Sequence, residues 1–159
     1  MTDRPLALDS FIPFRLSFTS NLVSDTIART YDALFGLSIP EWRLIAVVAE
    51  TGGTSQNAIG ARTRMDTVTV SRAAIALVDR GLLQRRANPG DRRSHLLTLT
   101  SAGQELHGAI APKALDLERR IFAGFDRAEI DAFVAMLRRI DAVTLGLEDD
   151  GEDGGEDRD

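Results

Sequence analysis

The chain has 159 residues, which fits a single domain large enough to bury an apolar core without disulfides or metal ions. It contains no cysteine and only two histidines, which excludes disulfides and thiol redox sensing and argues against a metal site. No apolar run is long enough to span a bilayer and the N-terminus lacks a signal-peptide pattern, so we expect a cytoplasmic protein with no membrane partner.

The net charge of −5 conceals two opposite segments. Residues 62–95 carry eight arginines against three aspartates, whereas residues 148–159 carry eight acids against one arginine. The first segment is a basic patch in an acidic chain, which favours a polyanionic partner, although a solvated charged face is the alternative. The second has no apolar residue, so we expect 148–159 to be a disordered acidic tail.

Helical periodicity predicts a long first helix over residues 10–35, with apolar and aromatic side chains on one wide face. That face either packs in the core or lies between subunits, and the pattern leaves both possibilities open. Ser38 and Glu41 have the spacing of a capping box, which predicts a second helix that ends at Gly52.

Two shorter helices are expected next. Thr54 is a candidate N-cap for a helix over about residues 55–63, and Asp66 for a helix over 67–80 that ends at Gly81. The apolar residues of the second of these helices fall on one face, so its remaining face is available to a partner.

The segment that follows is the most informative part of the chain. Apolar runs at Leu82–Leu83 and Leu96–Leu99 flank the turn sequence Asn88–Asp91, which predicts a β-hairpin with a longer loop. The loop also carries Arg92 and Arg93, whose guanidinium groups suit phosphate oxygens and narrow grooves.

Two further helices complete the chain. Ser101 and Gln104 are expected to cap a long helix that Pro112 kinks. Asp126 and Glu129 have the spacing of another capping box, which begins the last helix.

Helix, short helix, turn, helix and arginine-tipped hairpin is the order of a winged helix-turn-helix, so the expected fold is mainly α with a small β-hairpin wing. The helix after Asp66 is the candidate recognition helix, because recognition helices contact base edges through their first turns. The residues expected to contact DNA there are Thr67, Val68, Thr69, Ser71 and Arg72. Arg72 binds a base edge or a phosphate, or serves only solubility, and the sequence leaves these open.

In the loop, Arg93 is expected to enter the minor groove, with Asp91 orienting its guanidinium group. Arg92 is also expected to contact DNA, and the sequence leaves open that it contacts only a phosphate group. Arg85 and Arg86 are neighbours on one strand and point to opposite faces, so at most one of them faces DNA.

At this point the chain resembles the MarR-type transcriptional regulators, over about residues 10–146. The most specific part is Asn88–Ser94 followed by Leu97–Thr100, which is similar to the family's wing motif and the start of its next helix. Three further segments also resemble the family, namely Ile39–Arg43, Thr69–Arg72 and Leu77–Leu83.

The resemblance implies a homodimer, with residues 10–35 and 101–147 as a helical dimerisation region and 38–100 as the DNA-binding region. It also implies a pseudo-palindromic double-stranded operator, and repression that a small aromatic or phenolic acid relieves. Arg15, Trp42 and His107 are candidate residues for the effector pocket, and ordinary core or surface packing is the alternative for each.

Two other classes of function are less well supported. A winged-helix module that binds protein without specific DNA binding is the main alternative, but it does not require so many arginines in the wing. An enzyme is disfavoured, because the sequence has no phosphate-binding glycine loop, no cysteine nucleophile and no metal-ligand spacing. We therefore expect no cofactor.

Overall fold

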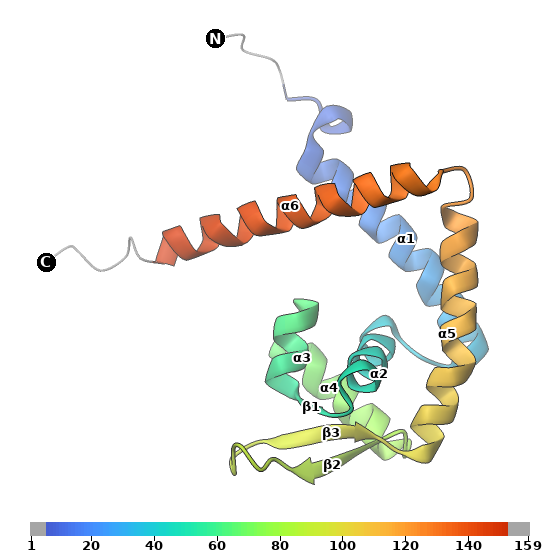
Figure 1. The fold of residues 1–159 in the computed structure, drawn as a ribbon, viewed down its shortest axis with the longest axis vertical. Coiled ribbons are helices and arrows are strands. Elements are labelled where there is room, and N and C mark those ends of the chain that lie inside the picture. The colour runs from blue at the N-terminus through green and yellow to red at the C-terminus, as the bar shows by residue number, and fades with distance from the viewer. Residues whose placement is uncertain (1–5, 153–159) are drawn as a thin grey trace, which may run out of the picture. The chain divides into compact units, whose positions relative to one another are not determined.

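The structure, a computed structural model, describes residues 6–152. Its elements in chain order are the 3₁₀ helix η1 (Leu8–Ser10), α1 (Ile12–Phe35), α2 (Ile39–Thr51), β1 (Thr54–Ser55), α3 (Gln56–Thr63), α4 (Thr67–Asp79), β2 (Leu83–Ala87), β3 (His95–Leu99), α5 (Ser101–Ile121) and α6 (Arg127–Glu152). The fold is mainly helical with one small sheet, as the sequence predicts (Figure 1). Two compact units divide after Ala114, within α5.

The capping signals in the sequence place most helix ends correctly. At the start of α2, the Ser38 hydroxyl accepts from the Glu41 N–H at 3.4 Å, and the Glu41 carboxylate accepts from the Ser38 N–H at 2.7 Å. Gly52 ends α2 in the left-handed conformation at φ 72°, which a side chain would disfavour. The capping box of Asp126 and Glu129 is also confirmed.

The predicted start of the third helix is wrong by one residue. Ser55 rather than Thr54 is the N-cap of α3, because its hydroxyl accepts from the Ala58 N–H at 3.2 Å. Thr54 and Ser55 form the strand β1, which pairs antiparallel with Leu97 and Leu96 of β3. The expected hairpin is therefore part of a three-stranded sheet in the order β1-β3-β2.

The last two helices differ from the expectation at one end each. Thr100 rather than Ser101 or Gln104 caps α5, since its hydroxyl accepts from the Gly103 N–H at 3.0 Å. The helix α6 continues to Glu152, so the expected disorder is wrong for residues 148–152. Residues 153–159 of the acidic tail lie outside the described residues.

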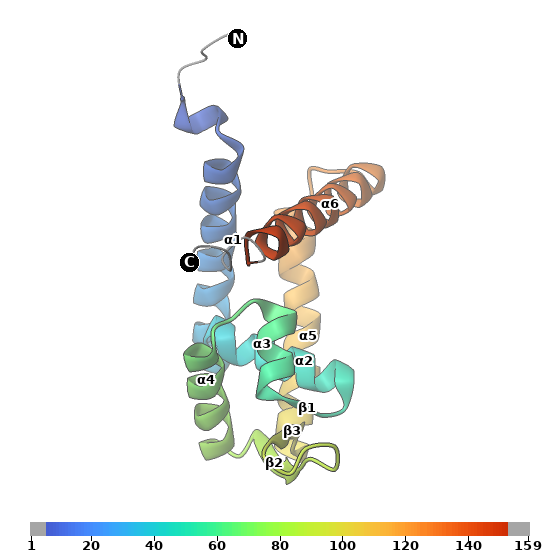
Figure 2. The ribbon, with the colours of Figure 1, turned by 90° about the vertical axis from the view of Figure 1, so that its left-hand side faces the viewer.

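The apolar core of the first unit joins its helices to the sheet. Figures 1 and 2 show α2, α3 and α4 gathered over one side of β1, β3 and β2, while the hairpin of β2 and β3 projects beyond them. The largest side chains in this core are completely or almost completely buried, and they include Leu44, Ile45, Ile59, Leu77, Leu83, Leu97 and Ile110. The hairpin is therefore anchored by its base and exposed at its tip.

The second unit consists of the end of α5 and the helix α6. Phe122 and Phe125 lie in the turn that joins the two helices, with ring centroids 6.1 Å apart. Along α6, seven large apolar side chains of the described residues are exposed in the single chain, namely Phe133, Val134, Met136, Ile140, Val143, Leu145 and Leu147. Within residues 6–152, no helix is long and apolar enough to cross a membrane.

One backbone junction connects α4, the sheet and α5. The Leu82 N–H donates to the Leu77 carbonyl of α4 at 2.9 Å. The Leu82 carbonyl accepts from the backbone N–H of Thr100 at 3.1 Å and from its hydroxyl at 3.2 Å. Gly103 lies so close that a Cβ there would be 2.1 Å from the same carbonyl oxygen.

We expect Gly103→Ala to lower the free energy of unfolding by about 1–3 kcal/mol, because the added methyl group overlaps the Leu82 carbonyl and the backbone must shift. Gly108→Ala is the matched control on the same helix, since a Cβ there has no neighbour within 4 Å. It should stabilise the protein by roughly 0.5–1 kcal/mol through helix propensity. Urea denaturation followed by circular dichroism measures both values, and equal effects would contradict the close approach.

Candidate nucleic-acid interface

The candidate recognition helix α4 begins at a strong N-cap. The Asp66 carboxylate accepts from the Thr69 N–H at 2.8 Å and from the Thr69 hydroxyl at 2.7 Å. These two hydrogen bonds lower the pKa of Asp66 because they favour its charged form, the backbone bond being the larger cause. Val70, Ala74 and Leu77 are buried and hold the helix against the core.

The opposite face of α4 carries the residues that the sequence assigns to DNA. Thr67, Val68 and Arg72 are exposed, whereas Thr69 and Ser71 are partly buried. Val68 keeps 57% of its surface exposed, which is unusual for a valine that packs in a core. The Thr69 hydroxyl already donates to Asp66, so the first role of Thr69 is to stabilise the helix start.

The loop of the wing is held by its own polar side chains. Asn88 donates from its amide to the Ser94 hydroxyl at 2.7 Å and accepts from the Gly90 N–H at 3.0 Å. The Asp91 carboxylate accepts from the backbone N–H of Arg93 at 2.9 Å. Asp91 thus orients the backbone of Arg93, and the ion pairs found within residues 6–152 do not include one between Asp91 and the Arg93 guanidinium group.

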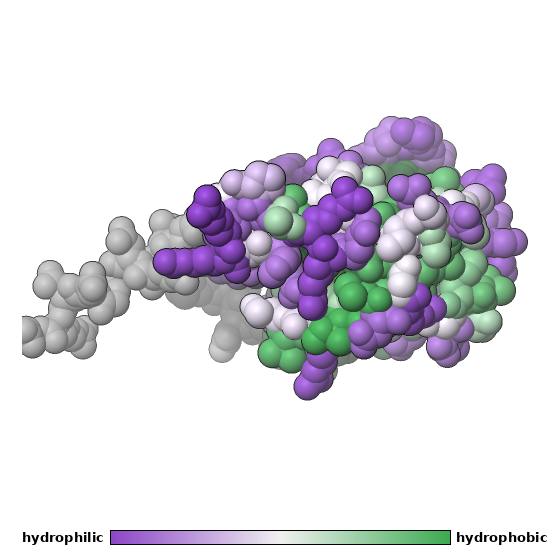
Figure 3. All heavy atoms as spheres, turned by 90° about the horizontal axis from the view of Figure 1, so that it is seen from below, coloured by the Kyte–Doolittle hydropathy of each residue, from purple (hydrophilic) through white to green (hydrophobic). Residues whose placement is uncertain are grey.

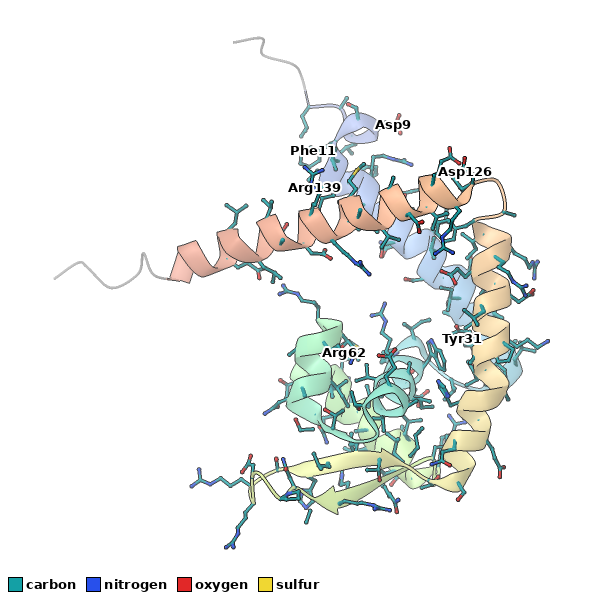
Figure 4. All side chains as sticks on the ribbon, viewed as in Figure 1. Asp9, Phe11, Tyr31, Arg62, Asp126 and Arg139 are labelled. Atoms are coloured by element: carbon teal, nitrogen blue, oxygen red, sulfur yellow. The ribbon has the colours of Figure 1, made fainter. Side chains whose placement is uncertain are left out.

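Arg92 and Arg93 are both exposed at the end of the wing. Figure 4 shows side chains that end in nitrogen extending from this tip, and hydrophilic side chains cover the projecting end of the hairpin in Figure 3. The loop therefore presents two cations on a backbone that its own hydrogen bonds shape.

The C-terminal end of α4 is hydrogen-bonded to the C-terminal end of α1. The Arg80 guanidinium donates to the carbonyl oxygens of Gly36 at 2.9 Å and Phe35 at 3.3 Å. These carbonyls belong to the C-terminal end of α1, where a cation is favourable because the helix dipole is negative there. Of the arginines in the basic segment 62–95, Arg80 thus has a structural role, as does Arg62, which pairs with Glu50 of α2.

Two of the three candidate effector residues come together. The rings of Trp42 and His107 stack with centroids 5.9 Å apart and an interplanar angle of 16°. Tyr31 meets Trp42 edge-on at 5.5 Å, and burial raises the pKa of its hydroxyl. Arg15 lies sixteen positions before Tyr31 on α1, about 24 Å along the helix, and contacts Asp9 instead.

Next to this aromatic cluster lies a hollow of about 470 Å³. It is lined by Val48, Ala49, Gly52, Arg86, Thr98, Leu99, Gln104 and His107. Sequence reasoning found only His107 among these, because the others come from four elements with no shared motif. The one signal available in the sequence was the alternation of side chains along β2, which places Arg86 and its neighbour Arg85 on opposite faces of the strand.

Comparison with known proteins identifies the fold and the family. Residues 35–94 match the MarR family. A probable transcriptional regulator from Pseudomonas aeruginosa is similar in structure, with 32% identity, a TM-score of 0.72, and coverage of 84% of this chain and 99% of that one. The chain belongs to the MarR family of transcriptional regulators.

Other members of known structure share the fold. A MarR/EmrR family regulator from Acinetobacter sp. ADP1 has a TM-score of 0.82 at 23% identity over 89% of this chain and 99% of that one. BpsR from Bordetella bronchiseptica has a TM-score of 0.79 at 25% identity over 87% and 98% of the two chains. That structure describes regulation of BpsR's DNA binding by 6-hydroxynicotinic acid. The segment that matches the MarR family runs from the end of α1 to the wing and contains α4.

The cap of α4 predicts a pH effect on stability. Because the pKa of Asp66 is lowered on folding, its contribution is complete above its ordinary pKa of about 4 and is lost as the pH falls through the lowered value. We expect the free energy of unfolding of the native protein to fall more steeply between about pH 5 and pH 2 than that of Asp66→Asn, which caps without titrating. Parallel pH profiles from urea titrations would contradict this role.

Proposed function

We propose that this MarR-family protein is a homodimeric, sequence-specific DNA-binding regulator. In each subunit α4 lies in the major groove, with Thr67, Val68, Ser71 and Arg72 at base edges and adjacent phosphates. The wing places Arg93 in the neighbouring minor groove and Arg92 near the phosphate backbone. The observation that supports this best is that α4 and the arginine-tipped wing are fixed to each other through the hydrogen bonds of Leu82.

The proposed dimer joins a second copy of this chain through residues 10–35 and 101–147. At the N-cap of α1 and along the helix, the large apolar side chains Phe11, Phe14, Phe18 and Leu22 are exposed in the single chain. Along α6, apolar positions at Ile130, Phe133, Leu137 and Ile140 follow the alternating spacing of three and four residues that suits packing against another helix, and Leu147 lies two turns further on the same face. Both faces lie outside residues 38–100, so a second copy can cover them and leave the winged helix accessible.

Such a dimer would bind a pseudo-palindromic operator, because each subunit offers one recognition helix to successive major grooves about 34 Å apart. We further propose that it represses its target genes in the cytoplasm and releases DNA when a small aromatic acid binds. The stacked pair of Trp42 and His107 supports an aromatic ligand nearby, since both rings are only partly buried and aromatic rings stack on one another. The regulation of BpsR by 6-hydroxynicotinic acid supports the same class of effector.

We expect Arg93→Ala to weaken operator binding about tenfold or more and to lower the slope of log affinity against log salt by about one. The reason is that the variant protein makes one cationic contact fewer with the DNA. Arg43→Ala is the control, since Arg43 is an exposed cation on α2, outside α4 and the wing. Fluorescence anisotropy across a salt series measures both quantities. Equal behaviour of the two variants would reject the minor-groove assignment of Arg93.

We expect Phe133→Asp to convert the dimer to a monomer of about 17.3 kDa, because a carboxylate replaces an apolar side chain in the proposed interface. Arg138→Asp is the control on the same helix, since it lies roughly 140° around the axis from Phe133. Size-exclusion chromatography with light scattering gives the masses. A Phe133→Asp protein that remains dimeric would exclude this face of α6 from the interface.

A further inference from the structure

We propose that Val68 contacts the 5-methyl group of a thymine in the major groove, so that each half-site of the operator has an A·T pair opposite the first turn of α4. The inference rests on the proposed function and deepens it, because it names the chemical group that the recognition helix selects. Val68 and the residues around it all lie in the first unit of the chain.

The side chain of Val68 points away from the core. Successive residues of an α-helix are about 100° apart around its axis, so Val68 lies roughly 160° from Val70 and roughly 180° from Leu77. Both of those residues are buried and hold α4 against the core. Val68 keeps 57% of its surface exposed, so its two methyl groups are available to a partner.

The fold gains little from a valine at this position. Valine is a weaker helix former than alanine, because its branched Cβ restricts the side-chain rotamer against the preceding turn. Single exposed apolar residues are common on protein surfaces. Val68, however, lies in the first turn of the helix, and this is the turn that a recognition helix presents to base edges.

The polar groups near Val68 are mostly occupied or partly covered. The Thr69 hydroxyl donates to the Asp66 carboxylate at 2.7 Å, and Ser71 is partly buried. Arg72, one turn after Val68, is exposed. An aliphatic side chain beside an exposed cation suits the major groove, because phosphates attract the arginine and the thymine methyl group is an apolar feature of the base edges there.

A second aliphatic residue on the same stripe of α4 provides the matched control. Ile75 is 48% exposed and follows Val68 by seven positions, which is about 10.5 Å along the helix axis. Recognition helices contact base edges through their N-terminal residues, so we assign the methyl contact to Val68 and not to Ile75. The two residues are both branched and exposed, and they differ in their distance from the start of the helix.

Deoxyuridine tests this contact, because it differs from thymidine only in lacking the 5-methyl group. The duplex that flanks the gene of this protein is prepared with thymidine or with deoxyuridine throughout, and fluorescence anisotropy gives the affinity of the full-length protein for each. We expect the native protein to bind the uracil duplex at least about fourfold more weakly, which is the effect of losing one buried methyl group.

The variants assign that loss to one residue. Val68→Ala should reduce the ratio of the two affinities by at least about fourfold, whereas Ile75→Ala should keep the native ratio. Any effect of uracil on DNA shape is common to all three proteins and cancels in this comparison. A native ratio in Val68→Ala, or a reduced ratio in Ile75→Ala alone, would overturn the assignment.

Stability measurements exclude a structural origin of the effect. The urea midpoint of Val68→Ala should equal or exceed that of the native protein, because alanine is the better helix former and no buried contact is lost. A lower midpoint would mean that Val68 packs within the fold, which would overturn the proposed role.

The same titrations distinguish this inference from the proposed function. If the native protein does not bind the thymidine duplex at low salt, the proposed function fails, and the methyl contact fails with it. If the native protein binds the thymidine and uracil duplexes equally well, the proposed function stands and only the methyl contact is refuted. The second result is also the one expected if Val68 contacts a protein partner instead of DNA.

Discussion

The hydrogen bonds at Leu82 are the constraint on which the rest of this structure depends. Its N–H completes the end of α4, and its carbonyl accepts twice from Thr100, at the point where β3 passes into α5. The Thr100 hydroxyl also donates to the Gly81 carbonyl at 2.6 Å, and the close approach of α5 requires Gly103. A recognition helix and a wing are useful together only if their relative placement is constant, and this junction supplies that constancy.

Local hydrogen bonds shape the parts that we propose to face DNA, and they leave the cations of the wing loop unpaired. Asp91 accepts from a backbone N–H rather than from the guanidinium group of Arg93, and the Asn88 side chain closes the loop. Charge on the wing therefore remains available to phosphates, although the chain as a whole carries −5. Arg80, by contrast, donates to the end of α1, so an arginine in the basic segment can serve the fold instead of a partner.

Much of this fold was predictable because its signals are local. Capping boxes, glycine helix ends and helical periodicity depend on residues within a few positions of one another, and they locate α2, α4 and α6. The strand β1 was missed because it has two residues and pairs with Leu96 and Leu97, more than forty positions away. The hollow around Arg86 and Thr98 was missed for the same reason, and residue type alone could not show that Arg15 lies about 24 Å along α1 from Tyr31.

The salt dependence of DNA affinity shows whether this MarR-family chain acts on duplex DNA through α4 and the wing, as we propose. The measurement is fluorescence anisotropy with the duplex that flanks its own gene, from about 50 to 200 mM salt, the range over which several phosphate contacts change affinity by orders of magnitude. If α4 and the wing bind duplex DNA, we expect saturable binding with a steep linear fall of log affinity against log salt. Affinity that does not change with salt, or no binding at the lowest salt, would contradict it.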